Sequence, residues 1–298
     1  MSDFRLKVFQ SVAKNLSFTK ASQELFVSQP AITKHIQELE TYYQVRLFER
    51  QGSKISLTVA GELLLKHSEK ILEDYKRLEY EMHLLHNEYI GELKLGASTT
   101  IAQYVLLPLL ANFIAKFPKV SLSLLNGNSR GIEAALQEHR IDLGLVEGIF
   151  RLPSLKYLPF LQDELVAVVN AHSKFAVQDE ITPEELPDIP LVLRERGSGT
   201  LDVFERALSQ HNMKLSSLHV LMYLGSTESI KLFLEHTDCM GIVSIRSVHK
   251  ELVAGNLRVV EIKGMPMQRE FNFVQLQGQE GGLSQVFMRF AGLHSKNL

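Results

Sequence analysis

Apolar side chains near the amino terminus recur at intervals of three and four residues in two short stretches. Ala21 and Leu25 mark the first stretch, and Ile32, Ile36 and Leu39 mark the second. Such spacing places the apolar residues on one buried face of a helix. The pattern therefore predicts two short amphipathic helices joined by a tight turn.

The second of these helices begins with side chains that can contact bases. Ser28 is a suitable N-cap, and Pro30 falls in the first helical turn, where its missing backbone N–H costs little. Gln29, Thr33 and Lys34 then project from the exposed face. Glutamine can bridge N6 and N7 of adenine, threonine can contact a base or a thymine methyl group, and lysine can reach guanine or phosphate. These five residues predict a helix-turn-helix whose second helix enters the major groove.

Contacts to the DNA backbone are predicted on either side of this helix. Ser17 and Thr19, at the start of the preceding helix, would meet phosphate through hydroxyl and backbone N–H groups. After the second helix, two short apolar runs flank a polar tip that contains glycine, the pattern of a small hairpin or wing. Arg50, Ser53 and Lys54 would lie on this wing and face phosphate or the adjacent minor groove. An ordinary helical hairpin with a solvated polar face would explain the helices but not the wing.

The next segment has the period of a coiled coil. Thr58 can cap a helix that continues without proline to about Tyr89. Two sets of residues recur there at seven-residue spacing: Leu64, Ile71, Leu78 and Leu85, and, offset by four, Ser68, Tyr75, Met82 and Tyr89. This repeat predicts a dimerisation seam formed by Leu64, Ile71, Tyr75, Leu78, Met82 and Leu85. The alternative is a long helix packed on its own domain.

Charge supports this division of the chain. The 298 residues carry a net charge of −2, which is unexpected for a protein that binds DNA. Residues 1–57, however, contain eight basic and five acidic side chains, a net charge of +3, whereas residues 58–90 carry −3. Positive charge is thus confined to the part expected to contact phosphate. Because +3 is modest, binding should depend on two copies of the module.

From Gly91 onward the patterns of strands and helices alternate. The strands expected in this region are 93–95, 120–125, 141–146, 163–169, 191–193, 220–224 and 241–245, and the helices are 101–117, 131–138, 200–211, 229–235 and 283–293. This alternation predicts a mostly parallel, buried sheet. The fold class is therefore α/β, preceded by an all-α amino-terminal part.

Four junctions between a strand and the following helix are rich in small polar residues and glycine. Open α/β sheets bind ligands at the carboxyl ends of their strands, and helix N-termini attract anions. The candidate ligand-binding residues are Ser98, Thr99, Thr100, Asn128, Ser129, Arg194, Gly197, Ser198, Gly199, Thr200 and Thr227. Helix capping alone could explain each junction, but the set favours a pocket for a small anion. Arg194 or Arg196 could clamp the anion, whereas Glu195 and Glu228 would oppose a dianion if they line the pocket.

The sequence shows no catalytic, metal or cofactor motif. Gly197-Ser198-Gly199 lacks the first glycine of a nucleophile elbow, and no Cys/His cluster accompanies His83 and His86. The single cysteine, Cys239, excludes an intramolecular disulfide. No apolar run reaches the length of a membrane span and no signal peptide is evident, so we expect a cytoplasmic protein that is not an enzyme.

The amino-terminal motifs point to a family. Ser28-Gln29-Pro30-Ala31-Ile32-Thr33, followed by Leu47-Phe48-Glu49-Arg50 and Leu57-Thr58, resembles the winged helix-turn-helix of the LysR-type transcriptional regulators in order and spacing. The segment from Arg194 to Thr200 is similar to one in members that regulate sulfur assimilation or carbon fixation.

This resemblance implies a winged helix-turn-helix domain, a dimerisation helix and an effector domain similar to periplasmic solute-binding proteins. The implied ranges are 1–58 for the first domain, 59–90 for the linker helix, and 91–298 for the effector domain. Subdomain I would comprise about 91–162 and 268–298, and subdomain II about 163–267, with a ligand cleft between them. The chain would form a homodimer, either alone or paired with a second dimer as a tetramer.

We therefore expect a regulator whose promoter binding is modulated by a small anionic metabolite. Sulfate, a sulfur metabolite, a phosphorylated metabolite and a small carboxylate all remain candidate effectors. The other expected partners are double-stranded DNA with dyad symmetry and a second copy of the chain, with RNA polymerase as a further candidate. The alternative is a small-molecule-binding protein whose DNA-binding segment is vestigial, and an enzyme comes third.

Overall fold

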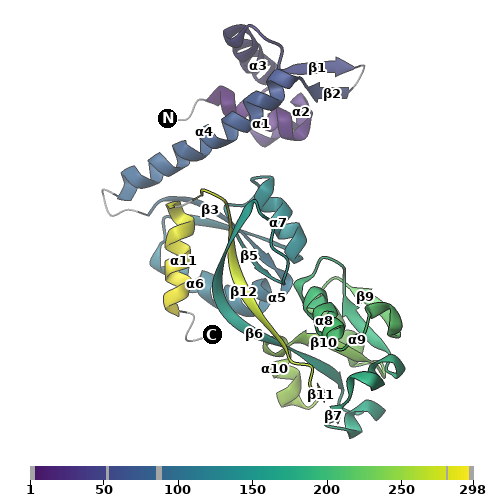
Figure 1. Ribbon diagram of the computed structural model, residues 1–298. Helices are drawn as coiled ribbons and strands as arrows, with labels where there is room; N and C mark the ends of the chain where they lie inside the picture. Colours follow the sequence, from purple (N-terminus) through teal and green to yellow (C-terminus); the bar gives the residue numbers. More distant parts are fainter. Residues whose placement is uncertain (1–3, 52–53, 85–88, 280, 295–298) are drawn as a thin grey trace. The chain divides into compact units, whose positions relative to one another are not determined.

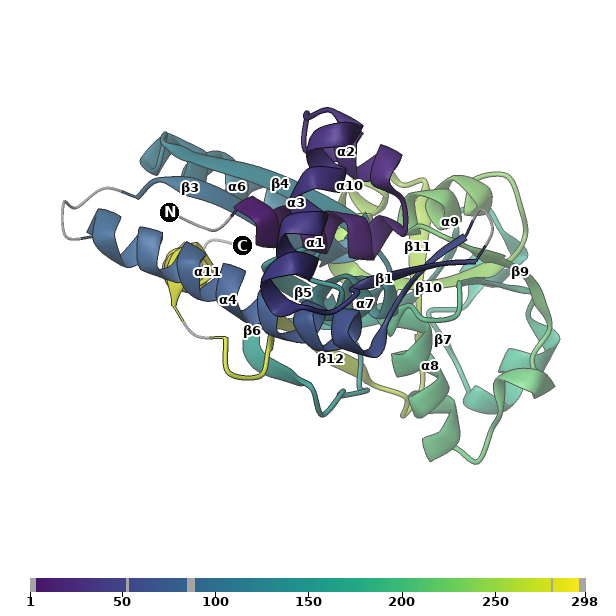
Figure 2. The same ribbon diagram turned by 90° about the horizontal axis from the view of Figure 1, so that it is seen from above.

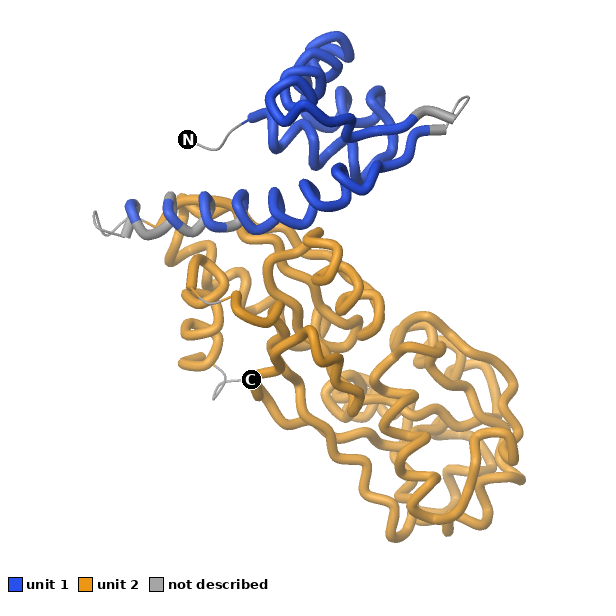
Figure 3. The backbone as a smooth tube through the Cα atoms, turned by 45° about the horizontal axis from the view of Figure 1, so that its top comes forward, with its two compact units in different colours: residues 1–88 blue, residues 89–298 orange. Residues whose placement is uncertain are grey.

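The computed structural model describes residues 4–51, 54–84, 89–279 and 281–294. The chain forms two compact units, residues 1–88 and residues 89–298 (Figure 3). Within the described residues, no helix is long and apolar enough to cross a membrane.

The first unit is a small helical domain with an antiparallel hairpin that projects beyond its short helices (Figures 1 and 2). Its core contains the predicted apolar faces, since Ala21, Ile32, Ile36 and Leu39 are buried together. Burial of each of the two isoleucines and of Leu39 stabilises the fold by about 1.5–3 kcal/mol. The elements are α1 Phe4–Asn15, α2 Phe18–Glu24, α3 Gln29–Tyr43, β1 Phe48–Gln51, β2 Lys54–Leu57 and α4 Val59–Leu84.

Polar contacts fix the hairpin to the helices. Glu40 of α3 accepts a hydrogen bond from the backbone N–H of Leu47 (2.8 Å). Thr58 Oγ1 donates to the carbonyl of Arg46 (2.7 Å) and accepts from the N–H of Gly61 (3.0 Å), so it caps α4 as predicted. A Cβ atom at Gly61 would lie 2.2 Å from the carbonyl oxygen of Leu47, so a larger residue would push α4 away from the hairpin.

The first part of α4 packs on its own unit. Leu64 is half-buried against the helix-turn-helix core, and Ser68 is fully buried, with its hydroxyl donating to the carbonyl of Leu65. The seven-residue repeat therefore serves an intramolecular contact at its start.

The later positions of the repeat differ from one another. Ile71, Leu78 and Met82 are exposed, and Tyr75 is half-buried. Leu85 lies outside the described residues. Tyr89 belongs to the second unit, where its ring packs edge-on against Phe117 with 4.9 Å between centroids. The exposed apolar positions of the repeat thus lie at Ile71, Leu78 and Met82.

The second unit contains one mixed sheet with helices on it. We call the half around β5 subdomain I and the half around β10 subdomain II. Subdomain I contains β3 Gly91–Ser98, α5 Thr99–Ile101, the π-helical segment Ala102–Leu106, α6 Leu107–Lys116, β4 Val120–Gly127, α7 Ser129–Gln137, β5 Leu143–Glu147 and α11 Gly282–His294. Subdomain II contains β7 Glu180–Ile181, β8 Leu191–Arg194, α8 Gly199–Gln210, β9 Val220–Leu224, α9 Thr227–Leu234, β10 Met240–Ser244, α10 Ile245–Ala254 and β11 Leu257–Ile262, with short 3-10 turns at Lys174–Val177, Pro183–Asp188 and Leu215–Ser217.

Two long strands, β6 Leu155–Asn170 and β12 Met267–Leu276, pass between the subdomains side by side (Figures 1 and 2). They pair antiparallel to each other, β12 with β5 in subdomain I and β6 with β10 in subdomain II. The strands β4-β3-β5 and β10-β8-β9 are parallel on either side. The prediction of a mostly parallel sheet is therefore wrong at the centre, because the chain crosses once and returns in the opposite direction.

The last helix packs on subdomain I. Phe113 of α6 is fully buried and meets the rings of Phe287 and Phe290 of α11 edge-on, with 5.2 and 5.3 Å between centroids.

The helix expected at 101–117 begins earlier, at Thr99, and includes a π-helical turn before α6. Such turns inside helices are frequent at functional sites.

Candidate DNA-binding and effector sites

The recognition helix α3 exposes the predicted DNA contacts at its start. The Oγ of Ser28 caps the helix by accepting a hydrogen bond from the backbone N–H three residues on (3.4 Å). Gln29, Pro30 and Lys34 are exposed, and Thr33 is half-buried, with its hydroxyl donating to the carbonyl of Gln29 (3.1 Å). The first turn of a recognition helix is the part that reaches base edges in the major groove.

The predicted phosphate contacts lie on α2 and the hairpin. The Oγ of Ser17 accepts a hydrogen bond from the N–H of Lys20 (3.2 Å) and so caps α2, and Thr19 is exposed. Arg50 lies on β1 and Lys54 on β2. Ser53 lies outside the described residues.

An exposed aromatic residue beside the recognition helix was missed by the sequence analysis. Phe26, in the turn before α3, is 95% exposed and has a left-handed φ of 53°. A turn residue takes part in no helical period, so the spacing of apolar residues gave no signal for it. Its position two residues before Ser28 places it at the same end of α3 as the predicted base contacts.

Three of the four predicted ligand junctions use a polar residue as a helix cap. Asn128 Oδ1, Ser198 Oγ and Ser226 Oγ each accept a hydrogen bond from the backbone N–H three residues on, at 2.9, 3.2 and 3.1 Å. Ser98 makes no capping hydrogen bond, and its hydroxyl donates to the carboxylate of Glu147. Capping therefore explains a polar residue at three junctions but not at the first.

The residues after Ser98 are buried and polar. Thr99 Oγ1 donates to the carbonyl of Gly127 (3.1 Å). Thr100 Oγ1, and Gln103 Oε1 one helical turn later, are buried atoms with no hydrogen-bond partner in the described part of the chain. Buried polar atoms of native proteins almost always have a partner, so these two need an explanation.

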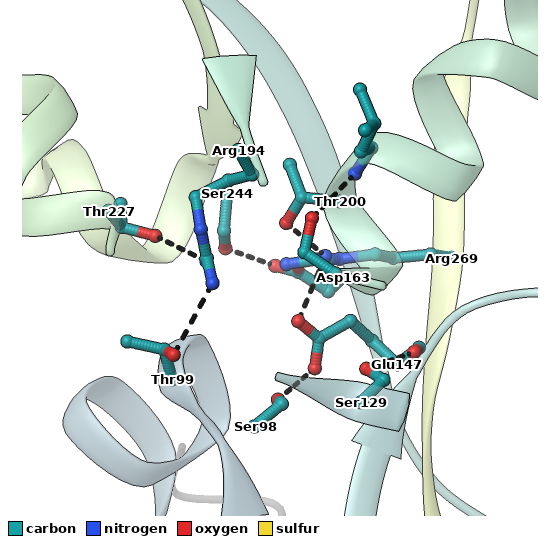
Figure 4. A network of polar contacts seen from close by, with 12 residues as sticks. Ser98, Thr99, Ser129, Glu147, Asp163, Arg194, Thr200, Thr227, Ser244 and Arg269 are labelled. Atoms are coloured by element: carbon teal, nitrogen blue, oxygen red, sulfur yellow. Dashed lines mark hydrogen bonds and ion pairs between the residues drawn. The ribbon is translucent and has the colours of Figure 1, made fainter. Parts of the chain in front are cut away.

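Arg194, at the end of β8, brings residues of both subdomains together (Figure 4). Its guanidinium donates to Thr99 Oγ1 of subdomain I (3.4 Å) and to Thr227 Oγ1 of subdomain II (3.5 Å). Glu195 forms an ion pair with it, at 2.8 Å from Nε. The side chain of Arg196, the alternative clamp, is 75% exposed and pairs with Glu205 at 3.7 Å.

A second buried arginine, Arg269 of β12, is the centre of an ion network that the sequence analysis missed (Figure 4). Its Nε lies 2.7 Å from Asp163 Oδ2, and its Nη1 donates to Thr200 Oγ1 (3.0 Å). Nη1 also lies 3.6 Å from Glu147 Oε1, and Ser244 Oγ donates to Asp163 (2.7 Å). The network thus joins strands β5, β6, β10 and β12 to the start of α8.

The other predicted ligand residues pack around this network. Ser129 Oγ donates to the carbonyl of Glu147 (2.7 Å). Gly199 also lies against Glu147, where a Cβ atom would be 2.1 Å from the carbonyl oxygen. Gly197 has a φ of 90°, and its carbonyl accepts a hydrogen bond from the N–H of Arg130 (3.2 Å). The contacts of Gly197 and Gly199 join the loop before α8 and the start of that helix to subdomain I.

The two carboxylates suspected of opposing an anion are both paired. Glu195 pairs with Arg194, and Glu228 accepts a hydrogen bond from the hydroxyl of Tyr104 and lies 2.9 Å from Lys231 Nζ. The charge of Glu228 is thus balanced by Lys231, a residue of the same helix.

Two other carboxyl groups, near the contact between subdomains I and II, have perturbed pKa values. Burial raises the pKa of Glu133 and of Asp202, and Arg130 opposes the change in both. Arg130 lies 3.7 Å from Asp202. Tyr157 donates to Glu133 (2.6 Å), and burial together with this carboxylate raises the pKa of Tyr157 to about 12. In the described part of the chain, no group of three His, Cys, Asp or Glu side chains could hold a metal ion.

Two family models match the chain. The model of a bacterial regulatory helix-turn-helix protein of the lysR family matches residues 4–62, and that of a LysR substrate binding domain matches residues 86–294. The chain belongs to the LysR family of transcriptional regulators. It is therefore a DNA-binding regulator with an effector-binding domain and not an enzyme, and the predicted family and fold class are confirmed.

Known proteins similar to this LysR-type chain cover most of its length. The HTH-type transcriptional regulator CysL of Bacillus subtilis is 28% identical over 270 residues, which cover 90% of this chain and 89% of CysL. A probable RuBisCO transcriptional regulator of Cyanidioschyzon merolae is 31% identical over 269 residues and covers 89% of each chain. The solved structure of the Synechocystis CcmR regulatory domain in complex with 2-PG has a TM-score of 0.63 and 27% identity, and covers 70% of this chain and 99% of that domain.

The buried charged residues of this LysR-type effector domain that were not predicted share one feature of the sequence. Glu147, Asp163 and Arg269 are charged residues at the end of, or inside, apolar strands, and the side chains of all three are buried. Such a charge needs a partner of opposite sign, so each one predicts a buried ion pair. The identity of the partner could not be read from the sequence.

Proposed function

We propose that this LysR-type regulator binds a small anionic metabolite between subdomains I and II, and that binding changes its affinity for promoter DNA. The observation that carries the proposal is the buried guanidinium of Arg194, which contacts Thr99 of one subdomain and Thr227 of the other. A guanidinium offers N–H donors in a plane that matches carboxylate, sulfate and phosphate. A ligand on this group would contact both subdomains and so favour one angle between them.

Two buried polar atoms support a ligand in this region. Thr100 Oγ1 and Gln103 Oε1 have no hydrogen-bond partner within the described structure. Each buried polar atom without a hydrogen-bond partner lowers the free energy of unfolding by about 1–3 kcal/mol. A metabolite that carries a hydroxyl or amine group beside its anionic group could satisfy both. The 2-PG bound to the similar CcmR regulatory domain agrees with a small ligand.

The rest of the chain would convert ligand binding into control of transcription. Residues 1–58 would bind double-stranded DNA, 59–90 would join two copies, and 91–298 would hold the metabolite. Recognition helices of a dimer would enter successive major grooves of a dyad-symmetric promoter site, and two dimers would pair on longer sites. Ligand and DNA would change each other's affinity by the same factor. We also propose that the protein contacts RNA polymerase and that it is located in the cytoplasm, where the DNA lies.

Thermal unfolding of the full chain with a panel of anions tests the effector site. The panel contains sulfate, thiosulfate, acetylserine, phosphoglycerate, 2-PG and small carboxylates. A ligand that binds only the folded chain stabilises it by about 2.7 kcal/mol at a concentration of 100 times Kd. We expect one class of anion to raise the midpoint in wild type, and to do so less in Thr100→Val and Thr227→Val.

Thr41→Val is the matched control, because Thr41 is an exposed residue of α3 in the other unit. It should keep the full response. A response that survives in both Thr100→Val and Thr227→Val would place the ligand elsewhere. A ligand that raises the midpoint should also change the affinity for promoter DNA, and an unchanged affinity would contradict the proposed coupling.

A further inference from the structure

Arg194 is buried, but the carboxylate that neutralises it is not. The side chain of Arg194 is 1% exposed, whereas that of Glu195 is 27% exposed. Nε of Arg194 donates to Oε2 of Glu195 (2.8 Å), and Nη2 donates to Oε1 (3.1 Å). These two parallel hydrogen bonds are the arrangement in which a guanidinium binds a carboxylate most strongly.

The remaining contacts of Arg194 are uncharged and long. They reach Thr99 Oγ1 at 3.4 Å, Thr227 Oγ1 at 3.5 Å and the carbonyl of Gly225 at 3.3 Å. Ordinary N–H···O hydrogen bonds have a heavy-atom distance of about 2.9–3.0 Å. Within the described residues, Glu195 is the one ion-pair partner of Arg194. A buried guanidinium must keep an anionic partner, but nothing fixes this partner as Glu195.

The ion pair of Arg269 shows the contrast. Its partner Asp163 is fully buried and also accepts a hydrogen bond from Ser244 (2.7 Å). Neither side chain of that pair can reach water unless the crossing strands separate. Glu195 already contacts water and can turn toward it without any such change.

We infer that Glu195 competes with the anionic group of the effector for Arg194. The inference rests on the proposed effector site. Binding exchanges the Glu195 carboxylate for an oxyanion on the same two nitrogens, and Glu195 turns to the solvent. The exchange preserves the charge around Arg194 only if the incoming group carries a single negative charge. It preserves both hydrogen bonds only if that group has two oxygens on one atom. The site therefore selects metabolites that carry a carboxylate, and Glu195 sets their affinity.

Dissociation constants of the full chain for acetate, phosphoglycerate and sulfate test this competition in wild type, Glu195→Gln and Arg194→Lys. Glutamine has the size of glutamate but no charge, so Glu195→Gln should bind acetate and phosphoglycerate at least tenfold more tightly than wild type. The gain for sulfate should be smaller. Glu205→Gln is the matched control, because it removes the same charge from the exposed pair with Arg196. It should leave all three constants within about twofold of wild type.

The outcomes separate this inference from the proposed effector site. Tighter binding by Glu195→Gln alone supports the competition, even if wild type binds none of the probes. Equal binding by wild type and Glu195→Gln, with binding lost in Arg194→Lys, overturns the competition and keeps the site. Binding that persists in Arg194→Lys overturns both. If no variant binds any probe, the competition is also overturned, because an unpaired buried guanidinium should collect an anion.

A second variant tests the competition in case Glu195→Gln does not fold. Glu195→Asp keeps the charge but is one methylene shorter, so it holds the guanidinium less well. It should bind acetate about threefold more tightly than wild type, and an unchanged constant would count against the inference.

Discussion

Arg269 and Asp163 face each other on the two strands that cross between the subdomains, with Nε 2.7 Å from Oδ2. Both side chains are almost completely buried. The two residues are also register partners of β12 and β6. The ion pair therefore joins the strands at the place where the chain passes from one subdomain to the other.

Removal of one charge from this pair should destabilise the protein strongly. We expect Asp163→Asn to lower the free energy of unfolding by about 3–5 kcal/mol, because Arg269 would be left buried without its closest counter-ion. Asp163→Leu combined with Arg269→Met and Glu147→Gln should cost less than Asp163→Asn, since none of the three buried charges of this network remains. Denaturant unfolding of the full chain measures both.

Arg140→Met is the control for this prediction, because Arg140 pairs with Glu138 at 2.6 Å with both side chains about half exposed. An exposed pair contributes about 0–1 kcal/mol. Equal costs for Asp163→Asn and Arg140→Met would show that burial of the Arg269 pair has no energetic consequence.

The close contact between Gly199 and Glu147 predicts a different kind of damage. In Gly199→Ala the new methyl group would lie 2.1 Å from a carbonyl oxygen, and backbone cannot turn aside as a side chain can. We expect a loss of about 1–3 kcal/mol in stability from this overpacking. At Gly225, whose carbonyl accepts a hydrogen bond from Arg194, a Cβ atom would meet nothing within 4 Å. Gly225→Ala should therefore stay within about 0.5 kcal/mol of wild type, and denaturant unfolding of the full chain measures both variants.

Gln29 is expected to read a base. Its side chain is exposed on the first turn of α3, where it could bridge N6 and N7 of adenine. Gln29→Ala should reduce discrimination at one position of the operator by about 1–3 kcal/mol, measured by binding to a set of operators with single base changes. Gln37→Ala removes an exposed glutamine from a later turn of the same helix and should leave discrimination intact. A uniform loss for all sequences in Gln29→Ala would indicate a phosphate contact instead.

The exposed apolar residues of α4 predict the site of self-association. Leu78 is 50% exposed in a single chain, and a partner helix would cover it. Leu78→Asp should raise the dimer dissociation constant at least tenfold, since burial of one such side chain contributes about 1.5–3 kcal/mol. His67→Asp changes an exposed residue earlier on the helix and should leave the constant unchanged. Sedimentation equilibrium decides between these outcomes, and an unaffected Leu78→Asp dimer would place the interface elsewhere.

The sequence by itself determined the elements whose signals lie within a few residues. Ser28 and Thr58 cap α3 and α4 as predicted, since a cap bonds the N–H three residues on. The spacing of Ile32, Ile36 and Leu39 correctly placed them in one core. Order and spacing of the same short motifs identified the LysR family.

Only the tertiary structure decided which distant residues meet. Ser98 reaches Glu147, Arg194 reaches Thr99, and Arg269 reaches Asp163, across 49, 95 and 106 residues of sequence. The same polar residues could have capped a helix, as Ser198 does. A seven-residue repeat likewise records that Leu64 is apolar but not which surface covers it. Local periodicity specifies a face of a helix or strand, and the partner of that face is chosen by the packing of the whole chain.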